Sequence, residues 1–392
     1  MLMSLAYLLL VGLGAGLLAE KLHLPALLGM LLAGIVLGPY GLSILSDELL
    51  SLSTDLRQLA LVIILLRAGL SLNVNDLKKV GKPAILMCFV PACFEIVAMM
   101  LIAPRLFHIT LTEAALLGSV IGAVSPAVIV PKMIRLMENG YGTAKSIPQL
   151  ILAGASVDDV FVIVLFSIFT SLALEGTIAW VSFIDIPISI VLGIVVGVGA
   201  GWFVKCLFRW VKIDAYQVLL LLSVALLLNG LEQALKGTVA FSGLLAVMCM
   251  GITIKQIQGE ASKKLSLMFS KLWSGGEILL FVLVGAAVNI HYAVKAGWLA
   301  VLLILCVLVF RMVGVACCLI GSELTIKERI FCMIAYLPKA TVQAAIGSIP
   351  LSMGLACGEL VLTIAVLSIL IAAPLGAFLI DLTTSKLLIK AE

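Results

Sequence analysis

Charged residues are scarce in this sequence. Charged residues make up 12% of its 392 positions and hydrophobic residues 63%, and the mean hydropathy is +1.27. Soluble domains carry about 25% charged residues, and no hydrophilic stretch here is long enough for a separate soluble domain. We therefore expect residues 1–392 to form one all-α integral membrane domain, with the lipid bilayer as a partner and no nucleic-acid partner.

Patterns that bind metals or cofactors are also missing. The three histidines, His23, His108 and His291, are scattered, and the nine cysteines sit mostly in apolar runs without a CxxC pair. These spacings argue against a metal site or a disulfide framework, and we expect no cofactor. The first 20 residues lack the basic region and cleavage site of a signal peptide, so we expect a retained first helix.

Long apolar segments fill most of the chain. A helix that spans a bilayer needs about 20 apolar residues, within a range of about 17–25. On this measure the sequence predicts about 13 transmembrane helices. Their expected ranges are 1–20, 25–45, 55–73, 83–104, 112–136, 147–173, 183–208, 215–232, 238–256, 272–290, 297–321, 327–348 and 358–385.

The positions of the basic residues favour this count and an orientation. Of the 25 Lys and Arg residues, 18 lie in the loops that follow odd-numbered helices or in the C-terminal tail. The other loops hold only 4, namely Arg57, Arg105, Lys236 and Lys295. Because cytoplasmic loops are rich in Lys and Arg, we expect the N-terminus outside, the C-terminus in the cytoplasm, and a multi-pass protein of the cell inner membrane.

A few charged residues do not fit into loops. They are Arg67, Glu95, Asp158, Asp159, Arg311 and Lys339. A charge at the centre of a spanning helix costs at least about 2.5–3.5 kcal/mol, so buried charges should be paired and are functional candidates. Arg67 lies near a helix end, where its long side chain can reach the interface.

The segment AGASVDDVFVIVLF places two adjacent acids near the middle of a predicted helix. Asp158 and Asp159 are about 100° apart around that helix, so they can line one cavity but cannot face each other. Such a pair can hold protons or a small hard cation that prefers oxygen ligands. An intramembrane aspartyl protease is disfavoured because it needs two aspartates from separate helices facing each other.

Two predicted helices are interrupted. GSVIGAVSPAVIVPKM puts Pro126 and Pro131 inside the fifth, and MIAYLPKATVQAAIGSIPL puts Pro338 and several polar residues inside the twelfth. Proline removes a backbone donor, and irregular backbone at membrane depth is tolerated only where it is buried or lines a cavity. Two interrupted helices at corresponding places in two halves predict a transporter ion site within inverted repeats.

These segments resemble one known superfamily. The motifs are LPALLGMLLAGIVLGP, RAGLSLN, AVSPAVIVP, the Asp158–Asp159 pair and LPKATVQAAIG. Over nearly the whole chain the sequence is similar to the monovalent cation/proton antiporters, and most of all to the NHA-type sodium/proton antiporters. The resemblance implies a 13-helix fold with two broken crossing helices, homodimers, and an elevator-like movement of a core against a panel.

The resemblance also implies a division of the chain. The panel or dimerisation helices would cover about 1–73 and 215–290, and the core ion-transport helices about 83–173 and 297–385. A linker helix would cover about 183–208. Together these ranges would form a single transmembrane antiporter domain.

Site residues follow from the resemblance position by position. Asp159 matches the acid that binds the transported ion, Asp158 its partner, and Lys339 the basic residue of the second broken helix. Glu95 and Arg311 match a buried ion pair. Ser125 stands where many superfamily members have an acid or Asn, so it offers a neutral oxygen.

We expect secondary active exchange of Na⁺ or Li⁺ for H⁺, in which the two aspartates alternate between protons and the cation. Lys339 is expected to compete for Asp158. A sodium-coupled symporter of an organic anion is disfavoured because the acids would repel an anion. Transport data are needed to exclude a K⁺/H⁺ antiporter.

Overall fold

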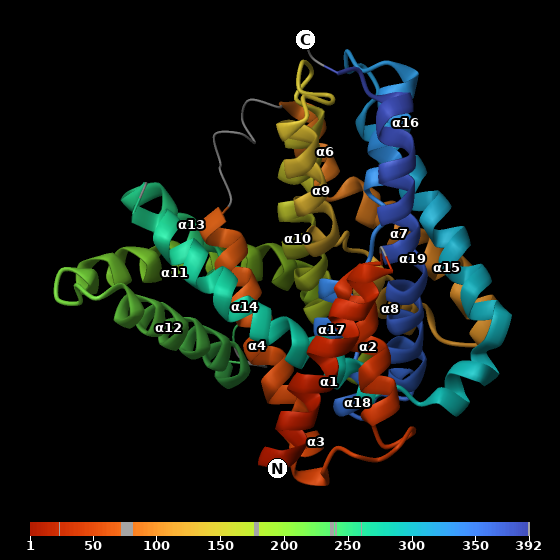
Figure 1. Cartoon of the computed structure of the whole chain (residues 1–392), viewed down its shortest axis with the longest axis horizontal. Helices are drawn as coiled ribbons and strands as arrows, with labels where there is room; N and C mark the ends of the chain where they lie inside the picture. Colours follow the sequence, from red (N-terminus) through yellow and green to blue (C-terminus); the bar gives the residue numbers. More distant parts are fainter. Residues whose placement is uncertain are drawn as a thin grey trace. The chain divides into compact units, whose positions relative to one another are not determined.

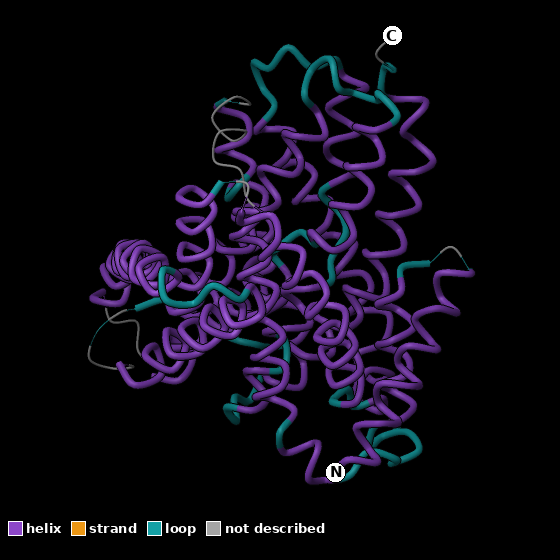
Figure 2. The backbone as a smooth tube through the Cα atoms, turned by 60° about the vertical axis from the view of Figure 1, so that its left-hand side comes forward, coloured by secondary structure: helices purple, strands orange, loops and turns teal. Residues whose placement is uncertain are grey.

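Helices make up nearly all of the described chain (Figures 1 and 2). The structure is a computed structural model, and it describes residues 1–22, 24–71, 81–175, 180–235, 239, 241–259 and 261–390. Within these residues the one strand-like pairing is a single bridge between Tyr141 and Lys390. Helices suit a bilayer because they satisfy their own backbone polar groups.

The described helices have the following bounds. They are α1 (Leu2–Lys21), α2 (Ala26–Leu37), α3 (Asp47–Ser51), α4 (Ser53–Ser71), α6 (Lys82–Met87), α7 (Val90–Phe107), α8 (Leu111–Ile121), α9 (Pro126–Glu138), α10 (Ile147–Glu175), α11 (Trp180–Phe208), α12 (Asp214–Leu235), α13 (Gly243–Gln258), α14 (Ala261–Ala286), α15 (Ile290–Cys318), α16 (Ile326–Ala335), α17 (Thr341–Ile346), α18 (Ile349–Ser352) and α19 (Gly358–Leu387). Seven stretches of the described residues are long and apolar enough to cross a membrane. The count of thirteen spans and the orientation stay predictions.

Most of the predicted ranges are helical, but two boundaries were wrong. The range 25–45 is helical only to Leu37, because Gly38 is extended and Pro39 follows it. The range 272–290 belongs to a longer helix, α14, which begins at Ala261. Lys78, Lys79, Lys236 and His23 lie outside the described residues.

The chain divides into two compact units, which we describe separately. Unit 1 comprises Met1–Ser51, Val74–Leu174 and Phe281–Glu392, and unit 2 comprises Leu52–Asn73 and Glu175–Leu280. Of the candidates that the sequence singled out, Arg67 belongs to unit 2, and the others belong to unit 1.

Unit 2 packs α4, α11, α12, α13 and most of α14. Glycines allow very close helix contacts here: a Cβ on Gly69 would lie 2.4 Å from Met248 O, and one on Gly197 would lie 2.4 Å from Ala246 O. Arg57, which we placed in a loop, lies in α4 and is buried, and its Nε donates to Ser53 O at 3.1 Å.

Unit 1 carries a stripe of small residues along α2, as the LPALLGMLLAGIVLGP segment predicted. A Cβ on Gly34 would lie 2.0 Å from Val282 O, and one on Gly285 would lie 2.1 Å from Leu31 O. The backbones of α2 and the end of α14 are therefore in direct contact. Only glycine fits at these two positions.

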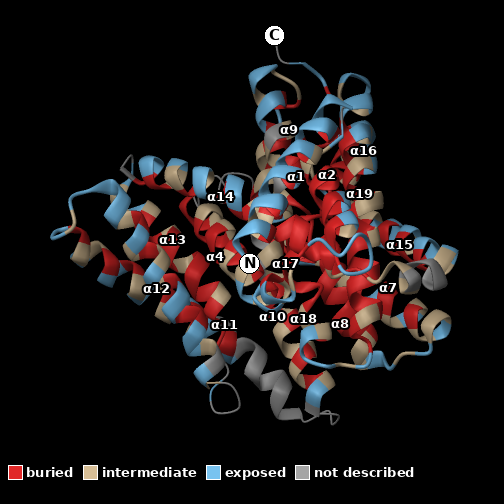
Figure 3. Cartoon of the chain, turned by 60° about the horizontal axis from the view of Figure 1, so that its bottom comes forward, coloured by how far each residue is buried: buried red, intermediate tan, exposed pale blue. Residues whose placement is uncertain are grey.

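The interior of unit 1 is buried around α8, α10, α17 and α19, whereas the outward faces of its helices are apolar and exposed (Figure 3). Leu10 is 69% exposed, Trp298 71% and Phe378 64%. Large apolar side chains on the outside suit lipid as the surrounding solvent. The exposed apolar surface therefore agrees with the apolar composition, which predicted an integral membrane protein.

Both predicted helices are interrupted, at Pro126 and at Pro338, whereas Pro131 lies within the continuous helix α9. The first consists of α8 and α9 with residues 122–125 between them, and the second consists of α16 and α17 with residues 336–340 between them. Pro126 opens α9, where its missing N–H costs no helical hydrogen bond.

The two broken helices also begin in the same way. In α8 the Thr110 side chain accepts from the backbone of Glu113 while the Glu113 side chain accepts from Thr110 N, and Thr325 and Glu328 form the same capping box in α16. Each box satisfies two orphan donors at a helix start. The motif Thr-x-x-Glu is readable in the sequence at both places.

Candidate functional site

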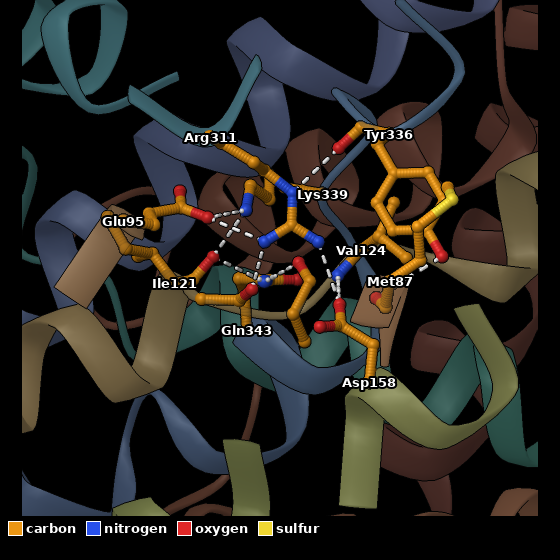
Figure 4. A network of polar contacts seen from close by, with 11 residues as sticks. Met87, Glu95, Ile121, Val124, Asp158, Arg311, Tyr336, Lys339 and Gln343 are labelled. Atoms are coloured by element: carbon orange, nitrogen blue, oxygen red, sulfur yellow. Dashed lines mark hydrogen bonds and ion pairs between the residues drawn. The ribbon is translucent and has the colours of Figure 1, made fainter. Parts of the chain in front are cut away.

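The two breaks meet inside unit 1. The backbone N–H of Ser125 in the first break donates to Pro338 O in the second at 2.8 Å. Figure 4 shows the polar side chains that gather around this crossing. They come from α7, α10, α15 and α17 and from the second break itself.

Cationic and amide groups cover the carboxyl end of α8. Lys339 Nζ donates to Ile121 O at 2.7 Å, and Gln343 Nε2 donates to Ile121 O at 3.2 Å and to Ala123 O at 2.8 Å. Arg311 Nη1 donates to Gly122 O. The last carbonyls of a helix lack partners and carry partial negative charge, so positive charge is favoured here.

A carboxylate covers the start of α9. Asp158, on α10, is completely buried, and its Oδ2 accepts from Val124 N at 2.8 Å and from Arg311 Nη2 at 2.7 Å. Negative charge is favoured beside the free N–H groups at a helix start. The first break is therefore flanked by positive charge on one side and negative charge on the other.

Arg311 lies between two acids (Figure 4). Its Nη1 lies 2.7 Å from Glu95 Oε2 and its Nη2 lies 2.7 Å from Asp158 Oδ2, while its Nε donates to Tyr336 O at 2.8 Å. Its guanidinium carbon also lies 5.5 Å from the centre of the Tyr336 ring. Counting Gly122 O, Arg311 donates to two carboxylates and two carbonyls, which is more acceptors than the three N–H donors of an ammonium group can serve.

Lys339 completes an alternating chain of charges. Its Nζ lies 2.6 Å from Glu95 Oε2, so the order is Lys339, Glu95, Arg311, Asp158. All four side chains are at most 1% exposed. Buried ions at this depth persist only when they are paired and hydrogen-bonded, and here each is.

The structure brings the predicted residues together but changes one pairing. The Glu95–Arg311 contact is present as expected, whereas the expected contact of Lys339 with Asp158 is wrong. Lys339 follows Pro338 in the second break and reaches Glu95 and Ile121 O, and Arg311 takes Asp158 instead. The guanidinium group of Arg311 contacts both acids, so Arg311 makes the contact with Asp158 that was expected of Lys339.

Asp159 stands outside this chain of pairs. It is half-buried, next to the fully buried Asp158 on α10, and its Oδ1 is buried without a hydrogen-bond partner. Four other oxygens near the crossing share this lack of a partner. They are Asp158 Oδ1, Ser125 Oγ, Thr341 Oγ1 and Gln343 Oε1.

Unpartnered buried oxygens are uncommon in folded proteins and call for an explanation. Carboxylate and hydroxyl oxygens are the ligands that hard cations prefer. The described residues contain no group of three or more His, Cys, Asp or Glu side chains placed to hold a metal ion. A cation held here would therefore use the two aspartates together with neutral oxygens.

Sequence reasoning missed two further groups at the crossing. Tyr336 supports Arg311 with its carbonyl and its ring, and Gln343 donates to two carbonyls of the first break. Both lie in the MIAYLPKATVQAAIGSIPL segment, whose polar residues were the available signal. Arg67 is half-buried in α4 of unit 2 and takes no part in these contacts.

Comparison with known proteins places the chain in a family. The family described as "Sodium/hydrogen exchanger, transmembrane" matches residues 5–385. Sodium/hydrogen exchanger 9B2 of Mus musculus is 34% identical over 387 residues, which cover 94% of this chain and 69% of that protein. Sodium/hydrogen exchanger 9B1 of Homo sapiens is 32% identical over 385 residues, covering 93% and 73%.

The fold has a solved counterpart as well. The structure of the sodium proton antiporter MjNhaP1 from Methanocaldococcus jannaschii at pH 8 superposes with a TM-score of 0.84 at 21% identity, over 98% of this chain and 99% of that chain. The family match, the relatives and the fold thus confirm the predicted resemblance to the monovalent cation/proton antiporters. The chain belongs to the sodium/hydrogen exchanger family, within the monovalent cation/proton antiporter superfamily and of the NHA type.

Proposed function

We propose that this antiporter exchanges one Na⁺ or Li⁺ for one H⁺, and that Asp159 carries each in turn with Asp158 as its partner. The observation that carries the proposal is the contrast between two neighbouring acids. Asp158 Oδ2 is held by Arg311 and Val124 N, whereas Asp159 has no hydrogen bond or ion pair with the described residues and its Oδ1 is buried. The unpartnered acid is the one free to change its occupant.

Charge balance supports a one-for-one exchange. Glu95 and Asp158 supply two negative charges, and Arg311 and Lys339 supply two positive charges, in one connected set. Arginine does not release its proton in proteins, and Lys339 is held by Glu95 and Ile121 O. Ionised Asp159 then adds a single negative charge, which one proton or one monovalent cation neutralises.

Competition at the same oxygens produces the exchange. A proton on Asp159 removes the charge that attracts the cation, and a bound cation removes the electron pairs that attract the proton. Asp158 Oδ1 and Ser125 Oγ are further oxygens that support a cation at this place. Neither occupant needs a separate gate to displace the other.

Alternating access completes the proposal. The site would be carried between the two sides of the cell inner membrane by an elevator-like movement of a core, residues 83–173 and 297–385, against a panel, residues 1–73 and 215–290. The linker would be residues 183–208, and the panel would form the contact in a homodimer. Neutrality with either occupant supports this movement, because a net charge in a low-dielectric region is costly.

The test is proton flux in everted membrane vesicles after addition of Na⁺, Li⁺ or K⁺. We expect Na⁺ and Li⁺ to release protons, and Asp159→Asn to abolish the release. Asp214→Asn, at an exposed acid that begins α12, is the matched control and should keep it. Unchanged flux in Asp159→Asn would overturn the assignment, and a response to K⁺ alone would establish the K⁺/H⁺ alternative.

A further inference from the structure

Gln343 is a buried polar residue at the crossing that has no role in the exchange chemistry proposed above. It is completely buried in α17, and its Nε2 donates to Ala123 O at 2.8 Å and to Ile121 O at 3.2 Å. Its Oε1 has no partner. The opposite amide orientation would set Oε1 against two carbonyl oxygens, so hydrogen bonding fixes the orientation.

The two ends of one peptide group are held by Gln343 and by Asp158. The carbonyl of Ala123 accepts from Gln343 Nε2. The N–H of Val124, which belongs to the same peptide group, donates to Asp158 Oδ2 at 2.8 Å (Figure 4). A peptide group is planar and rotates as a rigid unit. A rotation that releases the carbonyl from Gln343 therefore turns the N–H away from Asp158.

We propose that Gln343 is a positioning residue of the exchange reaction, which keeps the Ala123–Val124 peptide turned with its N–H on Asp158. This inference rests on the proposed function. The Val124 N–H and Arg311 Nη2 together hold Asp158 Oδ2, so the carboxylate keeps one orientation and its unpartnered Oδ1 stays available to a cation. Gln343 thus favours Na⁺ over H⁺ in the competition at Asp159.

A purely structural role makes a different prediction. As a cap on the free carbonyls of α8, Gln343 would stabilise the fold, and its loss would lower the melting temperature alone. A positioning role changes the balance between cation and proton. Measurements of the KM for Na⁺ and of the pH dependence of exchange distinguish the two roles, because only a positioning role changes these quantities.

The experiment measures Na⁺-driven proton flux in proteoliposomes across a range of pH. Gln343→Met keeps the length of the side chain and removes both donors. We expect its KM for Na⁺ to rise about tenfold, which equals about 1.4 kcal/mol, and its pH dependence to move about one unit to higher pH. The maximal rate at saturating Na⁺ and high pH should be retained.

Gln217→Met is the matched control, because Gln217 Nε2 also donates to a backbone carbonyl, Val211 O at 2.8 Å, but does so in unit 2. We expect it to leave the KM and the pH dependence unchanged. If Gln343→Met does not fold, Gln343→Asn carries the same test, because its amide is one methylene too short to reach both carbonyls.

A second measurement tests whether Gln343 acts on exchange through Asp158. In an Asp158→Asn background the carboxylate that the Val124 N–H holds is gone, so adding Gln343→Met should not move the pH dependence of thermal stabilisation by Na⁺. A further shift there, or a single variant with unchanged KM and pH dependence, would overturn the positioning role. Absence of Na⁺-driven flux in the wild type would instead overturn the proposed function on which it rests.

Discussion

Replacing Glu95 tests whether the buried charges act as one balanced set. Glu95 Oε2 accepts from both Arg311 and Lys339, so Glu95→Gln leaves two buried cations facing one paired anion, Asp158. Adding Lys339→Met to this variant removes one cation. The double variant again has one cation and one anion, as Arg311 and Asp158.

The magnitude follows from the contacts. Two charge-assisted hydrogen bonds, at 2.7 and 2.6 Å, become bonds to a neutral acceptor, and each loses about 1 kcal/mol. Together with an uncompensated buried cation, Glu95→Gln should cost about 3–5 kcal/mol of stability. The double variant should recover about 1–3 kcal/mol of this loss, a typical coupling energy for residues in contact. Ile121 O keeps its bond from Gln343 after the loss of Lys339.

The assay is thermal unfolding of the purified protein in detergent at fixed NaCl, followed by Na⁺ titration of the same samples. We expect Glu95→Gln to melt well below the wild type and to bind Na⁺ at least about tenfold more weakly, because the excess cation now offsets ionised Asp159. The double variant should melt above Glu95→Gln and regain Na⁺ binding. A double variant as unstable as the sum of its single substitutions would refute the balanced set.

Two further substitutions probe the supports of the site. A Cβ on Gly154 would lie 2.0 Å from the hydroxyl of the buried Tyr336, so Gly154→Ala should displace Tyr336 from Arg311 and lower Na⁺-driven flux at least about tenfold. Gly199→Ala, on α11 with nothing within 4 Å, is its control and should leave flux unchanged. Thr325→Ala removes the capping box of α16 and should cost about 1 kcal/mol in thermal unfolding without changing the KM for Na⁺.

Much of the fold follows from features that act locally. Pro126 and Pro338 predict the breaks because proline removes a donor wherever it stands, and Glu95 and Arg311 predict a pair because unpaired buried charges are costly. The end of α2 was also readable, since Gly38 and Pro39 form a common stop signal that the apolar run obscured.

The ion-pair and hydrogen-bond partners of the buried polar residues could not be predicted from the sequence in the same way. Lys339 and Arg311 both had Asp158 and Glu95 as possible partners, and the crossing geometry of the two breaks decides between them. Gln343 is distant in sequence from Ala123, and the two segments meet where the breaks cross, at contacts such as Ser125–Pro338 and Lys339–Ile121. Such pairings depend on how helices cross rather than on any local pattern.

The most direct test of the central claim is the effect of membrane potential on exchange by the wild-type protein in proteoliposomes. A potential is imposed with a K⁺ gradient and valinomycin while Na⁺-driven proton flux is recorded. If one monovalent cation replaces one proton at Asp159, no net charge moves, and the flux will be the same at every imposed potential. A flux that the potential alone can drive or reverse would contradict the claim.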